Sequence, residues 1–279
     1  MLTARQLLPL LVLLGACQHD PLESSDQIAG WANSASSLAV FTHGYEPLAF
    51  ADGEISFEDS GCPATSDDGT TVSIVGNGCG DIDGDVFYGS ATVVRTNNGR
   101  DLDLDGYGRS RDGGPVGFVT GSFDVTELET DLFAFDVDLV VEGGVDSEIQ
   151  YSGTVRGSYD GPTLWNGEGA VRREGGAIHD GLVEAVTVDQ LRDNEICPGE
   201  GISGTTTLVS DEHVIEIRYD GATDCDEQES ARWSRDGVDK GLVGGVVCAI
   251  GHPGGRAPRG PALALLGLVA LALVARRRR

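Results

Sequence analysis

Residues 131–141, with the sequence DLFAFDVDLVV, decide the fold class of this chain. Four large apolar side chains, Phe133, Phe135, Val137 and Leu139, occupy every second position of this run, and two aspartates stand among the positions between them. A period of two is that of a β-strand with one dry face and one wet face. The sequence therefore predicts a strand that packs one face against a hydrophobic core.

Similar β-rich runs recur along the chain from Glu54 onward: they are residues 85–95, 116–125, 148–159, 164–173, 182–188 and 213–219. Clusters of Gly, Asp and Asn separate these runs every eight to fifteen residues, which is typical of antiparallel meanders. We expect an all-β, antiparallel domain, either a sandwich or a curled, barrel-like sheet of roughly ten to fourteen strands. Residues 22–38 are expected to form one short helix before it, with Trp31 and Leu38 facing inward.

The chain has six cysteines, of which four lie in the β-rich region. Three pairings of these four are possible, and we favour the local one, Cys62–Cys79 and Cys197–Cys225. Each of these bridges would close one short β-rich loop and contribute about 3 kcal/mol by restricting the unfolded chain. A metal site is the weaker alternative, because no two cysteines have CxxC spacing and the histidines are scattered.

The first residues have the proportions of a signal peptide: Arg5 precedes an apolar run at residues 7–16, which is too short to span a bilayer. Its last three residues and the cysteine that follows read Leu-Gly-Ala-Cys17, which resembles the lipobox of bacterial lipoproteins. The resemblance implies removal of residues 1–16 and a diacylated Cys17 at the mature N-terminus. Gln18 follows, so the aspartate that retains such proteins in the inner membrane is absent. The alternative is an ordinary signal peptide with an incidental cysteine.

The other end of the chain carries an apolar run at residues 261–275, followed directly by Arg276, Arg277, Arg278 and Arg279. As a helix this run is about 22 Å long, against a hydrocarbon core of about 30 Å. It can insert if the arginine stems reach the headgroup layer. Arginines in this position stay on the cytoplasmic side, which predicts that the body of the protein is exported.

The order of parts at this end resembles the C-terminal sorting tails of Gram-negative bacteria. The myxobacterial (MYXO-CTERM) type carries a cysteine shortly before the helix, where this chain has Cys248. The Gly-Gly type has a glycine pair instead, which Gly254 and Gly255 would supply. The resemblance implies a tail that sorting machinery recognises and cuts; the alternative is a plain transmembrane anchor. Together the two ends predict an exported protein of the outer membrane or cell surface, held by lipid and by the C-terminal helix, with export and sorting machinery as partners.

The expected organisation has six segments. They are a signal peptide (1–16), a lipidated tether with the short helix (17–36), an acidic β-rich domain (37–247), a Gly/Pro-rich tether (248–260), the apolar helix (261–275) and the arginine cluster (276–279).

The body of the chain is strongly acidic. All 45 acidic residues lie between Asp20 and Lys240, together with 12 basic residues, so this stretch has a formal charge of −33. The value for the whole chain, −26, is smaller because seven arginines lie in the two ends. Such a body repels phosphate backbones and anionic lipid surfaces, which excludes nucleic acid as an expected partner.

One acidic motif suggests calcium, the only cofactor that the sequence brings forward. Asp101, Asp103 and Asp105, followed by Gly106, match the first half of an EF-hand-type loop with Asp112 at its twelfth position. That position usually holds a bidentate glutamate, and no helix-forming segments flank the motif. The alternative is a strand whose aspartates face water and whose leucines face the core.

Signatures of common enzymes are absent: the sequence contains no G-x-S-x-G elbow, no H-E-x-x-H helix and no phosphate-binding loop. We therefore assign no catalytic residue and expect an anchored, non-catalytic acidic domain for binding or structural display. Two alternatives remain. One is a surface hydrolase or carbohydrate-processing protein, which would need two carboxylates about 5 to 10 Å apart in a cleft. The other is a calcium-stabilised adhesion module.

Overall fold

The computed structural model describes residues 20–244 apart from 54, 58–60, 83, 111–113, 115, 144–145, 158–161, 176–179, 194–200 and 220–229. The described residues form the helices α1 (Ser25–Ala35) and α2 (Ser37–Ala51). They also form the strands β1 (Ala64–Asp67), β2 (Thr71–Val75), β3 (Cys79–Gly80), β4 (Val86–Arg95), β5 (Gly99–Ser110), β6 (Phe118–Glu129), β7 (Leu132–Glu142), β8 (Asp146–Gly157), β9 (Thr163–Glu174), β10 (Gly181–Arg192), β11 (Ser203–Val209), β12 (Val214–Arg218), β13 (Ser230–Arg235) and β14 (Val238–Gly244).

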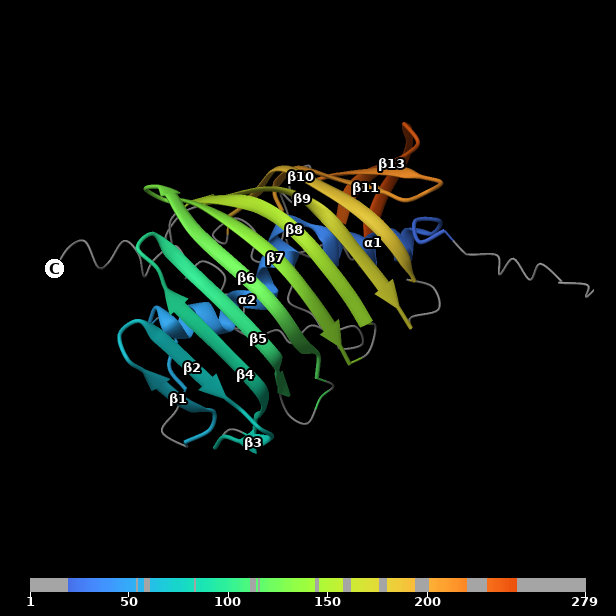
Figure 1. Cartoon of the computed structure of the whole chain (residues 1–279). Coiled ribbons are helices and arrows are strands. Elements are labelled where there is room, and N and C mark those ends of the chain that lie inside the picture. The colour runs from blue at the N-terminus through green and yellow to red at the C-terminus, as the bar shows by residue number, and fades with distance from the viewer. Residues whose placement is uncertain are drawn as a thin grey trace, which may run out of the picture.

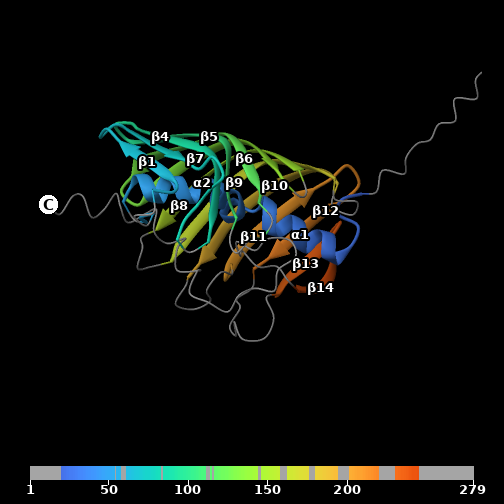
Figure 2. The ribbon, with the colours of Figure 1, turned by 90° about the horizontal axis from the view of Figure 1, so that it is seen from below.

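All of these strands belong to one open antiparallel sheet. Its order follows the chain from β1 to β14, and only β3 lies off this path, where it pairs with β4. Figure 1 shows the sheet as a single curved layer, and Figure 2 shows that both helices lie within its concave side. The expectation of an all-β, antiparallel, curled sheet is confirmed, and the sandwich alternative is not the arrangement found.

Strand β7 shows why the sequence folds in this way. Its residues Phe133, Phe135, Val137 and Leu139 are each at most 2% exposed. Asp136 and Asp138, which lie on the other face of the strand, are exposed. The neighbouring strands β6 and β8 also alternate over much of their length and pair with β7 in register, so these three strands turn their apolar sides toward the helices.

The curl of the sheet is increased by bulges near β4–β6. The register shifts between Tyr88 and Ser90 on β4, and between Leu104 and Tyr107 on β5. Gly89 and Gly106 lie at these shifts with φ values of 58° and 57°, a left-handed conformation that favours glycine. Bulges of this kind bend a strand and increase its twist, which helps the sheet to wrap around the helices.

The helical region is longer than expected: two helices replace the single helix predicted at residues 22–38. Helix α1 begins with a capping box between Ser24 and Gln27. Ser36, in an extended conformation, ends α1 and caps α2. The second helix contains Pro47 and several poor helix formers, so it depends on burial of its apolar side chains rather than on propensity.

The core lies between α2 and the concave face of the sheet. Phe41 of α2 makes edge-to-face contacts with Phe123, Phe135 and Trp165, with ring centroids 5.3, 5.5 and 5.2 Å apart. Trp31 of α1 is fully buried as well. The segment assigned from sequence to the tether and short helix is therefore packed into the folded body, at least from Asp20 onward.

One of the two predicted disulfides is present. Cys62 and Cys79 are joined with their Cα atoms 5.8 Å apart, which confirms this half of the local pairing. Cys197 and Cys225 lie outside the described residues, so their pairing stays a prediction. In the part of the chain that is described, neither helix is long and apolar enough to cross a membrane; the apolar run at 261–275 lies outside that part.

Candidate functional site

The convex face of the sheet carries a row of side chains that runs across the strands. Asp101 of β5 pairs with Asp124 of β6, and Asp124 pairs with Asp136 of β7. The row continues through Ser152 of β8 to Glu168 of β9. Since residues opposite one another in neighbouring strands have Cβ atoms about 5 Å apart, these carboxylates and the serine form one continuous polar band.

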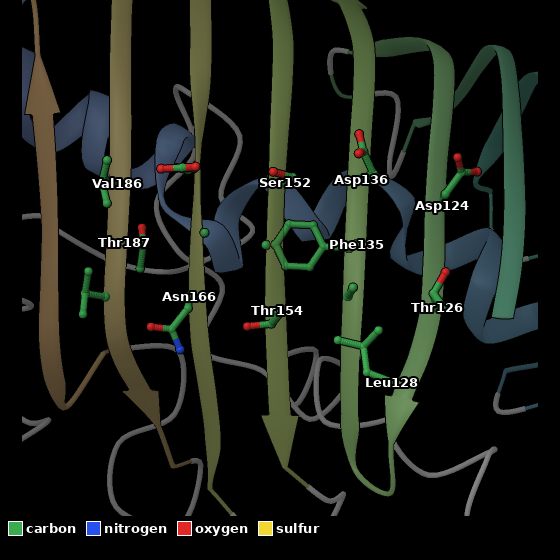
Figure 3. Close-up of a pocket in the computed structure, with 15 residues that line it drawn as sticks. Asp124, Thr126, Leu128, Phe135, Asp136, Ser152, Thr154, Asn166, Val186 and Thr187 are labelled. Atoms are coloured by element: carbon green, nitrogen blue, oxygen red, sulfur yellow. The ribbon is translucent and has the colours of Figure 1, made fainter. Parts of the chain in front are cut away.

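A shallow trough with a volume of about 720 Å³ lies along this band, across strands β6–β10 (Figure 3). It is lined by Asp124, Thr126, Leu128, Ala134, Phe135, Asp136, Ser152, Gly153, Thr154, Asn166, Gly167, Glu168, Val186, Thr187 and Val188. Figure 3 shows the trough with the helices behind the sheet; of its labelled residues, Asp124, Asp136 and Val186 are exposed, whereas Phe135 and Thr187 are buried on the helix side. The trough therefore belongs to the outer, convex face of the sheet.

Two glycines form part of the sheet beneath the trough. Gly153 and Gly167 lie opposite each other on β8 and β9. A Cβ atom on Gly153 would lie 2.5 Å from the ring of Phe135, and one on Gly167 would lie 2.7 Å from Oγ of Ser37. Because these two residues have no side chains, Phe135 and Ser37 can pack directly against the backbone of β8 and β9 from the concave side. These contacts hold the backbone that forms the floor of the trough.

The carboxylates of the row repel one another. The pKa of Asp124 is raised, first by partial burial and then by the negative charges of Asp101 and Asp136. Among the described residues, no arginine, lysine or histidine forms a salt bridge with any of these three aspartates. The row is therefore a negative surface without compensating cations among the described residues. Like charges directly opposite one another in a sheet also lower its stability.

Hydroxyl and amide groups lie between the carboxylates and one end of the trough. Thr126 of β6 and Thr154 of β8 place hydroxyls on the two strands that flank β7. Asn166 is held in place because its Oδ1 accepts a hydrogen bond of 2.8 Å from the amide of Asp189. The amide nitrogen of the Asn166 side chain is thereby directed away from that bond.

The β10 side of the trough is aliphatic. Val186 and Val188 are 39% and 47% exposed, and Leu128 of β6 at the opposite side is 54% exposed. Valines that face water on successive outward positions of one strand gain nothing from the core. The trough is thus bordered by carboxylates and by apolar side chains that have no cover among the described residues.

The polar groups on the concave side serve packing. Ser37, Tyr151, Thr187, Thr206 and Tyr219 form a buried chain of hydroxyls with O···O distances of 2.9 to 3.3 Å. Burial raises the pKa of Tyr151, so its hydroxyl stays protonated and can donate. This chain satisfies buried oxygens and ties the start of α2 to the sheet.

A second inner cluster joins α2 to strand β5 and to Asp85, the residue before β4. Nη1 of Arg109 donates to Glu46 at 2.6 Å, and Nε of Arg109 donates to Asp85 at 2.8 Å. The hydroxyl of Tyr107 donates to Glu46 at 3.1 Å, and burial raises the pKa of Tyr107 well above its usual value. These contacts fix the helix against the rim of the sheet.

A partly buried basic pair, Arg173 of β9 and His43 of α2, lies near the helices. The guanidinium of Arg173 is 4.7 Å from the ring centroid of Trp31, and burial lowers the pKa of Arg173 to about 10. Burial and the charge of Arg173 lower the pKa of His43 to about 4. His43 is therefore neutral near pH 7 and is not poised for acid–base chemistry there.

The aspartates of the expected calcium motif lie on strand β5. Asp101, Asp103 and Asp105 are exposed on the convex face, whereas Leu102 and Leu104 are each 1% exposed. This is the strand alternative, and Asp112 lies outside the described residues. Among the residues that are described, no group of three His, Cys, Asp or Glu side chains is arranged to hold a metal ion.

The remaining predicted site residues lie outside the described part of the chain: they are Cys17, Cys248, Gly254, Gly255 and Arg276, Arg277, Arg278 and Arg279. The trough itself was not predicted. Its signal in the sequence is the outward half of the alternation in β6–β10, but this alternation does not say which outward residues become neighbours.

No known protein family, curated protein or solved structure matches this chain. Its function is therefore argued from the geometry of its own residues.

Proposed function

We propose that this protein is an exported lipoprotein of the bacterial cell envelope whose acidic β domain is a non-catalytic module for binding or display. The convex face of the sheet is the binding surface, and the concave face packs against the helices to form the core. Cys17 carries the lipid, and the C-terminal tail either sorts the protein or anchors it.

The open trough on the convex face is the observation that supports a binding role. Pockets for small substrates usually enclose most of the ligand. This trough lies across five strands of a rigid sheet, and its carboxylates and aliphatic side chains point away from the core. A surface of this shape suits a ligand that lies along it.

The alternative, hydrolysis by two carboxylates, also has a geometric basis. Asp136 and Glu168 lie in the same row with Ser152 of β8 between them. Two strand spacings place their backbones about 10 Å apart, near the upper limit for inverting glycosidases. Turnover in a broad hydrolase screen that Asp136→Asn or Glu168→Gln abolishes would replace the binding proposal with this one.

Intact mass of the protein from the membrane fraction, with peptide mapping of both ends, tests the envelope part of the proposal. We expect a mature form that starts at an acylated Cys17 and lacks the residues after about Arg259. A form with an unmodified N-terminus that retains Arg279 would overturn both lipidation and sorting, leaving the tail as a plain anchor.

A further inference from the structure

We propose that the trough binds an extended polypeptide segment of a partner that carries both cationic and aliphatic side chains. This inference rests on the proposed binding function and adds the chemistry of the partner. The observation behind it is that acidic side chains and exposed aliphatic side chains line the same trough on the convex face.

The two surfaces follow the order of the strands. On β6 and β7, Asp124 and Asp136 face outward into the trough without a basic partner among the described residues. On β10, Val186 and Val188 face outward into its other side. A ligand that covers the trough therefore meets carboxylates over one part of its length and valines over another.

The dimensions of the trough fit a peptide. Five neighbouring strands give four spacings of about 4.8 Å, or about 19 Å in all. An extended chain advances about 3.3 Å per residue, so about six residues span this length. A compact cation or sugar would fill only part of it.

Side chains, rather than backbone pairing, would recognise the peptide. Each of the strands β6–β10 is hydrogen-bonded to a neighbour on both sides, so none of them offers a free edge for strand addition. Thr126, Thr154 and Asn166 supply hydrogen-bonding groups at the level of the trough. Removing the exposed area of Val186 and Val188 from water would favour binding.

Charge complementarity selects the sign of the partner. A second copy of this domain would bring another body with a formal charge of −33 against the trough, and anionic lipid would be repelled in the same way. A segment with Lys or Arg would relieve the repulsion among the carboxylates. Its aliphatic residues would cover the valines.

The test uses the full-length protein in a nonionic detergent and the labelled hexapeptide Lys-Val-Lys-Leu-Lys-Val, followed by fluorescence anisotropy. Two control peptides keep one feature each: Lys-Ser-Lys-Ser-Lys-Ser keeps the charge, and Glu-Val-Glu-Leu-Glu-Val keeps the aliphatic residues. We expect the first peptide to bind at least about tenfold more tightly than either control, a difference of about 1.4 kcal/mol.

Matched variants locate the binding. Asp124→Asn with Asp136→Asn, and separately Val186→Ser with Val188→Ser, should each weaken binding by about tenfold or more. The control pair Asp138→Asn with Leu182→Ser changes exposed residues of β7 and β10 that do not line the trough, and it should leave binding unchanged. All of these positions are exposed, so circular dichroism and thermal unfolding can confirm that the variants fold.

Three results would overturn the proposal: no binding at millimolar peptide, equal binding of the serine-containing peptide, or an equal loss in the control pair. The last two would indicate unspecific attraction to an acidic surface. None of them touches the envelope proposal, which depends on the mass of the two ends. Conversely, an unlipidated and unsorted protein that still binds the peptide would overturn the envelope proposal and leave this one intact.

Discussion

His43 connects the stability of the fold to pH. In the folded protein its pKa is lowered to about 4 by burial and by the charge of Arg173, whereas an unfolded histidine has a pKa of 6.5. Between these values the unfolded chain binds a proton that the folded chain does not. The contribution of His43 is therefore fully present above pH 6.5 and is lost as the pH falls toward 4.

We predict that the protein loses up to about 3 kcal/mol more unfolding free energy between pH 7 and pH 4 than its His43→Gln variant does. Urea unfolding of both proteins at several pH values measures this difference. The comparison cancels the titration of the many carboxylates, which both proteins share. Parallel pH profiles would mean that His43 titrates in the fold as it does in the unfolded chain.

At the scale of elements, the contact between α2 and the sheet depends on a glycine. A Cβ atom at Gly44 would lie 2.6 Å from Cδ2 of Phe123, whose ring is fully buried and packs edge-to-face on Phe41. Alanine favours a helix over glycine by about 1 kcal/mol, so propensity alone would make the substitution stabilising. Overpacking a filled core usually costs about 1 to 3 kcal/mol, and here it opposes that gain.

We therefore predict that Gly44→Ala lowers the unfolding free energy by about 1 kcal/mol or more, as measured by chemical denaturation. Adding Phe123→Leu should make the alanine less costly, because the smaller side chain leaves room. A double-mutant cycle isolates this coupling from the cost of losing the ring. If Gly44→Ala were neutral or stabilising in the native background, helix and sheet would not be in the tight contact described.

Elements differed in how far the sequence could predict them. The alternation in 131–141 predicts the buried face of β7 residue by residue, because one side of the strand meets the core and the other meets water. Helix α2 was missed over most of its length, since Gly44 and Pro47 are poor helix formers and only the tertiary contacts of Phe41 and its neighbours stabilise them as helix. The Cys62–Cys79 bridge was predicted because a short β-rich loop favours local pairing.

At the scale of the whole molecule, the trough escaped prediction for a different reason. Asp124 and Val186 belong to strands that are not neighbours in the sheet, and their common position depends on the register of every pairing between β6 and β10. Sequence indicates that each of them faces outward, but a shift of one residue in any register would change the side chains that meet. The surface is therefore a property of the assembled sheet.

The net charge of the body predicts how the whole molecule responds to ions. Its formal charge of −33 opposes the compact state, so screening by any salt should raise the melting temperature. Asp101, Asp103 and Asp105 alternate along an extended strand, which spreads their Cα atoms over about 13 Å. A single calcium ion binds oxygens at about 2.4 Å, so these three side chains cannot readily converge on it.

We predict that calcium and magnesium chloride at equal millimolar concentration raise the melting temperature by the same amount, as measured by differential scanning calorimetry. Two divalent salts at equal concentration screen equally, whereas a built calcium site discriminates strongly by size and ligand number. The variant Asp101→Asn, Asp103→Asn, Asp105→Asn is the control: it should start from a higher melting temperature, because repulsion is reduced, and should respond equally to both ions. A calcium-specific excess that this variant loses would instead establish a calcium site on β5, and it would revive the calcium-stabilised module as the function of the domain.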